Sequence, residues 1–123
     1  MVAAAKWAKR GLPSGPVRLD PYRSGRSGEQ AARRVASALG AELGTLEDTR
    51  RCTDVMDPSS CRLDAAVLLA IAPPKITRDE ARVRIYAWYR QSSAREPVGK
   101  RSWDLTLRRS GGGWQVVEPH LLD

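Results

Sequence analysis

The clearest pattern in this chain of 123 residues is a regular alternation of apolar and polar residues in its C-terminal half. Residues 82–90 and 101–109 both alternate, which predicts two β-strands that each have one apolar face. Residues 114–118 continue the pattern after Ser110-Gly-Gly-Gly, a sequence typical of a hairpin turn. The C-terminal half therefore predicts an antiparallel meander.

The N-terminal half has a different, helical character. Residues 2–10 are rich in alanine, carry basic side chains at their end and stop at Gly11, which predicts a short helix. Residues 28–39 place apolar side chains at helical spacing and are followed by Gly40, which predicts a second helix.

Two further segments complete the predicted sheet. Residues 17–20 alternate over one short strand, and residues 65–72 form an apolar run that Pro73-Pro74 closes. Such a run is either a strand buried on both faces or a piece of helix, and its length and the double proline favour a strand. We therefore expect one α+β domain over residues 1–123, with two short N-terminal helices packed on an antiparallel sheet of about four strands.

The pairing of the long strands predicts which side chains share a face. If Tyr89 lies opposite Trp103, one face of the sheet is wholly apolar, and Asp104 lies beside Trp88 on the other face. That second face combines aromatic, basic and acidic side chains: Arg84, Tyr86, Trp88, Arg90, Asp104 and Arg108.

Charge favours an anionic partner but does not name one. The chain has 21 Lys+Arg against 14 Asp+Glu, a formal net charge of +7, and most of the cations are arginines. The arginines are scattered along the chain, and a GC-rich coding sequence is an alternative reason for their excess. A nucleic-acid-binding module is therefore an alternative that charge alone does not favour.

The cysteines and the single histidine limit the chemistry. With His120 as its one histidine and two cysteines, the chain cannot build a zinc finger or a haem-attachment pair, and we expect no cofactor and no metal. A turn at Asp57-Pro58 separates Cys52 from Cys61, which predicts a disulfide between them. The alternative is two free thiols.

The disulfide decides the expected location. A bridge predicts a secreted or periplasmic protein in its mature form, whereas free thiols would predict a cytoplasmic one. No apolar run approaches the about 18 residues that a membrane-spanning helix needs, so we expect no membrane insertion.

The C-terminal hairpin resembles a known group. The motif Asp104-Leu-Thr-Leu-Arg-Arg-Ser-Gly-Gly-Gly-Trp114-Gln-Val-Val117, preceded by residues 81–88, is similar to the closing strands of the nuclear-transport-factor-2-like superfamily, the cone-shaped α+β group of ketosteroid isomerase and polyketide cyclases. The resemblance implies a curved sheet wrapped around N-terminal helices, with a concavity that often holds an apolar ligand. The N-terminal half departs from the pattern, and no position matches the catalytic carboxylates of that group. The whole chain also resembles secreted bacterial proteins, which implies no function.

These observations favour a non-enzymatic ligand- or partner-binding domain that uses the aromatic and basic sheet face. The expected partner is a small ligand or a protein, with an anionic one favoured, and a homodimer through the same face is an alternative. The expected binding residues are Arg84, Tyr86, Trp88, Trp103 and Arg108.

A small lyase, isomerase or hydrolase of the cone-shaped group is the enzymatic alternative. Its candidate acid or base is Asp104 or His120. A Ser-His-Asp arrangement would have to use this histidine, and no Gly-x-Ser-x-Gly elbow accompanies it.

Overall fold

The computed structural model describes the backbone of residues 1–21 and 25–122, and the side chains of these residues apart from 25–29. The helices are α1 (Val2–Arg10), α2 (Gly25–Leu39) and α3 (Leu46–Thr49), with a 3-10 turn η1 at Pro58–Ser60. The strands are β1 (Val17–Asp20), β2 (Glu42–Leu43), β3 (Arg50–Cys52), β4 (Cys61–Leu63), β5 (Val67–Ile71), β6 (Lys75–Thr77), β7 (Glu80–Arg90), β8 (Val98–Ser110) and β9 (Gly113–Leu122).

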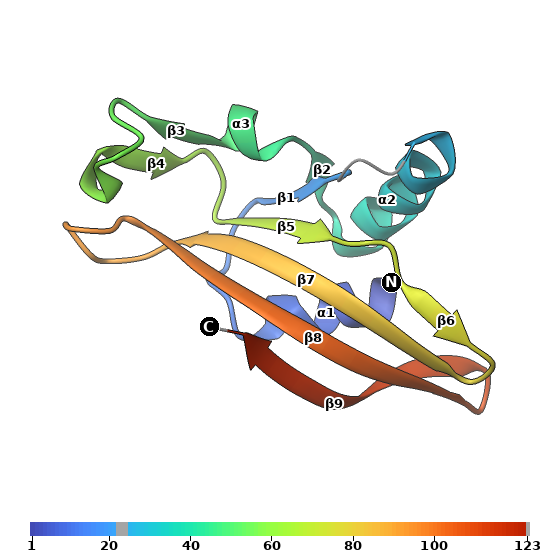
Figure 1. The fold of residues 1–123 in the computed structure, drawn as a ribbon. Helices are drawn as coiled ribbons and strands as arrows, with labels where there is room; N and C mark the ends of the chain where they lie inside the picture. The colour runs from blue at the N-terminus through green and yellow to red at the C-terminus, as the bar shows by residue number, and fades with distance from the viewer. Residues whose placement is uncertain (22–24, 123) are drawn as a thin grey trace.

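The main sheet is mixed and larger than the sequence predicted. Over the described residues it has seven strands in the order β2-β1-β5-β7-β8-β9, with β6 beside β7 (Figure 1). β1 runs parallel to both β2 and β5, whereas the pairs from β5 to β9 are antiparallel. The α+β class is confirmed, but the expectation of about four antiparallel strands is wrong. The additional strands have two or three residues each, which is too short to show alternation.

The helices keep the boundaries that their stop signals indicate. α1 covers the predicted residues, and α2 begins three residues earlier than expected, at Gly25, and ends at Leu39. Gly40 has φ +64°, and the N–H of Ala41 donates to the carbonyl of Ala36 at 2.8 Å. This is a Schellman cap, in which a glycine takes the left-handed conformation at low cost.

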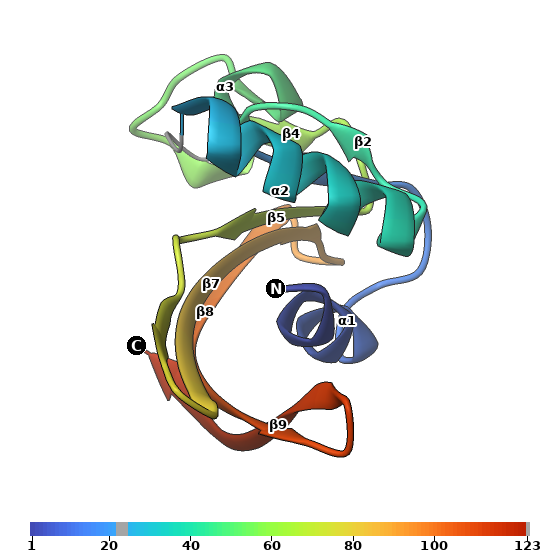
Figure 2. The ribbon, with the colours of Figure 1, turned by 90° about the vertical axis from the view of Figure 1, so that its right-hand side faces the viewer.

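The sheet curves around α1, and this defines its inner face (Figure 2). The long strands β7, β8 and β9 bend, and a bulge interrupts the pairing of β8 with β9 between Thr106 and Leu107. On the inner face, Trp7 of α1 and Trp103 of β8 pack edge to face, with their ring centroids 5.7 Å apart. Because α1 and these rings fill the concave side, this side is the main core of the protein.

β5 is buried on both of its faces, as the apolar run predicted. Val67 and Leu69 belong to the core on the inner face, whereas Leu68 and Ala70 belong to a second cluster on the outer face. Both faces of this strand are covered, so every one of its side chains is apolar.

The hairpin of β3 and β4 provides the cover on the outer face. The predicted disulfide between Cys52 and Cys61 is present and joins its two strands. Arg90 of β7 donates from its Nε to the carbonyl of Leu63 at 3.0 Å, which ties the hairpin to the sheet. The second cluster, which lies between hairpin and sheet, consists of Cys61, Leu63, Leu68, Ala70, Trp88 and Val98.

The pairing register of β7 and β8 differs from the predicted one. Trp103 lies opposite Ile85 instead of Tyr89, and Tyr89 lies opposite Gly99. The difference is four residues along β7, an even number, so every side chain stays on its predicted face. Gly99 is required here, because a Cβ at this position would overlap the ring of Tyr89.

The shift arises from a loop that is shorter than expected. β8 begins at Val98, because the N–H of Gln91 donates to the carbonyl of Pro97 at 2.9 Å and closes the turn. The amide of the Gln91 side chain donates to the carbonyl of Glu96 at 2.7 Å and reinforces it. Alternation alone cannot detect such a turn, since its signal is the same for any even shift.

We expect the disulfide to stabilise the hairpin by restricting the unfolded chain. The double variant Cys52→Ser/Cys61→Ser should lower the free energy of unfolding by roughly 2–3 kcal/mol, measured by urea denaturation. A thiol titration of the unfolded, unreduced protein is the control and should find no free thiol, with two appearing after reductant. Two free thiols before reduction would contradict the bridge.

Candidate functional site

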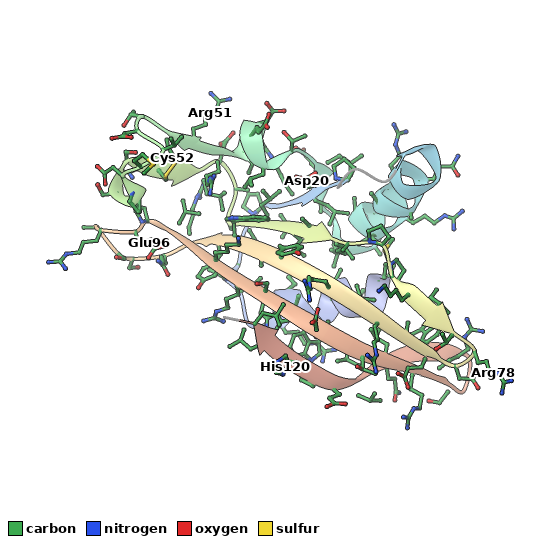
Figure 3. All side chains as sticks on the ribbon, in the orientation of Figure 1. Asp20, Arg51, Cys52, Arg78, Glu96 and His120 are labelled. Atoms are coloured by element: carbon green, nitrogen blue, oxygen red, sulfur yellow. A yellow bond between two sulfur atoms is a disulfide. The ribbon has the colours of Figure 1, made fainter. Side chains whose placement is uncertain are left out.

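The outer face of the sheet divides into a covered end and an open end. Even-numbered residues of β7 and β8 point to this face, as their pairing shows. At the covered end the β3–β4 hairpin lies over Trp88, whereas the surface at the open end is lined by β6, β7, β8 and the link from β5 to β6. Figure 3 labels Cys52 and Glu96 near the covered end and Arg78 beyond the open end.

Trp88 belongs to the covered end and is 8% exposed. Its ring stacks on that of Tyr86 with centroids 6.4 Å apart, and the Nζ of Lys100 lies 5.5 Å from the Trp88 centroid. Its Nε1 has no hydrogen-bond partner among the described residues. The sequence left open what covers this large side chain, and the structure shows that the chain's own hairpin does so.

Trp103 lies on the opposite face from Tyr86 and Trp88. It is 7% exposed and packs against Trp7 in the core. The structure therefore does not bring the three aromatic residues of the predicted binding set together. Alternation already places Trp103 on the apolar face, so one face of the sheet cannot present it together with Tyr86 and Trp88.

Arg84 and Asp104 form a bidentate ion pair across β7 and β8. The Nε and Nη2 of Arg84 donate to the two carboxylate oxygens of Asp104 at 2.7 and 3.0 Å. The hydrogen bonds to Asp104 and then to Tyr86 raise the pKa of Arg84, and the hydrogen bond from Arg84 lowers the pKa of Asp104. Asp104 lies opposite Arg84, so the expectation that it lies beside Trp88 is wrong.

This pair changes what either residue can do. A carboxylate held by a guanidinium stays ionised and is a poor general acid, and the guanidinium has less charge available for an external anion. His120 lies opposite Asp104 on β9 and is exposed. Its charge also lowers the pKa of Asp104, after the larger effect of Arg84, so Asp104 is not suited to act as an acid or a base near neutral pH.

The open end contains a hollow of about 450 Å³. Lys75 of β6 lies opposite Arg82 of β7, which places both cations on one side of it. The side chain of Arg82 is 76% exposed, and its Nε is 3.7 Å from Glu80, which is too long for a hydrogen bond. The hollow is lined by Ala72, Pro73, Lys75, Arg82, Val83, Arg84, Tyr86, Asp104 and Leu105.

Of the predicted binding residues, the structure brings Arg84 and Tyr86 to this hollow. Arg108 is exposed farther along the same face, opposite Glu80. Sequence reasoning missed Lys75, because a strand of three exposed residues carries no burial signal.

Comparison with family models, with curated proteins and with solved structures gives no match to this chain. In the described part of the chain, no helix is long and apolar enough to cross a membrane.

We expect Trp88 to act as a core residue. Trp88→Ala should lower the free energy of unfolding by about 3–5 kcal/mol in urea denaturation, because it leaves a cavity under the hairpin. Trp88→Phe is the matched control and should keep most of the stability, since the N–H that it removes makes no hydrogen bond among the described residues. Equal stability of Trp88→Ala and wild type would show that the ring is not core.

The ion pair predicts a pH dependence with a defined sign. The pKa of Asp104 is lowered in the folded state, so the pair stabilises the protein above the ordinary pKa of about 3.9 and loses this effect as pH falls through the lowered value. In a carboxyl NMR titration, Arg84→Gln should raise the pKa of Asp104, whereas Arg108→Gln should leave it nearly unchanged. The same change in the pKa of Asp104 in both variants would show that Arg84 is not its specific partner.

Proposed function

We propose that this protein is a non-enzymatic binding domain that holds an acidic segment of a partner protein in the hollow at the open end. The observation that carries the proposal is the pair of neighbouring cations Lys75 and Arg82 at the hollow. In the described part of the chain no ion pair includes Lys75, and that of Arg82 with Glu80 is loose, at 3.7 Å. Two neighbouring cations that project from a rigid sheet attract carboxylates and raise the rate of association.

The floor of the hollow suits a peptide segment. Ala72 and Pro73 contribute apolar surface, and Tyr86 contributes an aromatic ring with a polar end. Apolar surface with a charged rim is the usual composition of protein interfaces. An acidic segment that also carries apolar side chains would contact both.

The filled inner face argues against the enzymatic alternative. Curved sheets of the group that the C-terminal hairpin resembles often hold a ligand in their concavity, but here α1 and the Trp7–Trp103 contact occupy that space. The resemblance itself stays a prediction. The disulfide is compatible with an extracellular or periplasmic location, which we propose for this domain.

A hexaglutamate peptide tests the proposal by isothermal titration calorimetry at low salt. We expect binding that Lys75→Glu/Arg82→Glu weakens at least about tenfold. The matched control is Lys6→Glu/Arg10→Glu, which changes the net charge equally on exposed positions of α1 and should retain binding.

Two outcomes would refute the proposal. One is an equal loss of peptide binding in both double variants, which would indicate net charge rather than the hollow. The other is tighter binding of a single-stranded DNA oligonucleotide, with affinity that falls steeply with salt, which would favour the nucleic-acid alternative.

A further inference from the structure

The loop between the two cysteines presents an apolar tip. Val55 and Met56 are 80% and 86% exposed, and they are neighbours in the sequence. Single exposed apolar residues are common on protein surfaces, but two adjacent ones at the end of a projecting loop form a contact surface. We call residues 54–57 the loop tip.

Hydrogen bonds within the loop hold this tip in one conformation. The N–H of Asp57 donates to the carbonyl of Asp54 at 3.0 Å, and the N–H of Met56 donates to the Oδ1 of Asp54 at 3.0 Å. The N–H of Ser59 donates to the Oδ1 of Asp57 at 3.1 Å, and the hydroxyl of Ser60 donates to the carbonyl of Asp57 at 2.8 Å. The disulfide closes the base of the same loop. A tip that is already ordered loses little entropy when it binds.

The charge of the tip is opposite to that of the hollow. Asp54 and Asp57, on either side of the apolar pair, are the charged residues between the two cysteines, in a chain whose net charge is +7. The hollow has the cations Lys75 and Arg82 beside apolar surface from Ala72 and Pro73, and its remaining charged residues, Arg84 and Asp104, are paired with each other. The tip is thus an acidic segment with apolar side chains, the kind that the hollow would bind.

Tip and hollow both lie on the outer side of the sheet, at opposite ends of it. Val55 borders a smaller hollow together with Trp88 and Lys100, which places the tip at the covered end. Arg82 is six residues from Trp88 along β7, or about 20 Å in a strand. The loop tip is therefore too far from the hollow of its own chain to bind there while the hairpin stays packed on the sheet.

We infer that the partner is a second copy of this chain, with the loop tip of each copy seated in the hollow of the other. This inference rests on the proposed function and names its partner. In this arrangement the outer faces of the two copies face each other. The two-fold axis lies between these faces, at right angles to β7, and passes over the strand between Arg82 and Trp88. Rotation about this axis places the covered end of one copy over the open end of the other. Both contacts form at once, so the interface is closed and the assembly stops at a dimer.

Sedimentation velocity over about 1–500 µM tests the inference on the whole chain, and we expect a monomer–dimer equilibrium. Val55→Ser/Met56→Ser should raise the dimer dissociation constant at least about tenfold through the lost apolar contact. Asp54→Asn/Asp57→Asn removes the charge but keeps the side-chain oxygens that accept the loop hydrogen bonds, and it should weaken the dimer and reduce its salt dependence. Lys6→Glu/Arg10→Glu is again the control and should dimerise like the wild type.

A double-mutant cycle separates a direct contact from a general effect. In a Lys75→Gln/Arg82→Gln background, Asp54→Asn/Asp57→Asn should have little further effect on the dissociation constant, because its charge partners are already absent. Additive effects of the two double variants would overturn the inference. So would a wild type that stays monomeric over the whole range, or a dimer that the tip variants leave unchanged.

The two proposals fail in different ways. A monomeric wild type that still binds hexaglutamate through Lys75 and Arg82 overturns only the second-copy partner. An equal loss of hexaglutamate binding in the Lys75→Glu/Arg82→Glu and Lys6→Glu/Arg10→Glu variants overturns the hollow as a site for acidic segments. The dimer inference then fails with it. The calorimetry is therefore done at a concentration at which sedimentation finds monomer.

Discussion

The burial of β5 on both faces is the constraint on which the rest of the structure depends. Its five residues, Val67–Ile71, are all apolar and all buried, so the sheet needs cover on its outer face as well as its inner one. α1 and α2 supply the inner cover. The disulfide-linked hairpin of β3 and β4 supplies the outer one, and Arg90 fixes it through the carbonyl of Leu63. Without this hairpin, Leu68 and Trp88 would face water.

The limited size of that hairpin divides the outer face. β3 and β4 have three residues each, whereas β7 and β8 have 11 and 13, so the cover ends near Trp88 and the remainder of the face stays open. At the open end the link from β5 to β6 forms one wall of a hollow. The same hairpin that covers the core also projects the loop tip, so one element creates both the exposed apolar pair and the boundary of the open face.

The ion pairs of the outer face determine which of its cations can attract an anionic partner. The bidentate pair of Arg84 with Asp104 uses the charge of the arginine that the sequence placed at the centre of the face. Arg82 beside it has only the looser ion pair with Glu80, at 3.7 Å, and its side chain is 76% exposed. A net charge of +7 is therefore a weak guide to a partner, because the local pairing of each cation decides whether it attracts an anion.

The sequence by itself determined the long strands and their faces, since alternation with period two survives any even change of register, but it did not indicate the strands of two or three residues. The stop signals at Gly11 and Gly40 likewise indicated the helix ends, and the spacing of the cysteines indicated their bridge. Only the tertiary structure decided that the hairpin covers Trp88, that Lys75 lies opposite Arg82, and that a short turn moves Asp104 opposite Arg84. The physical reason is that periodicity records which side of a strand is apolar, whereas cover and pairing depend on segments far apart in the chain.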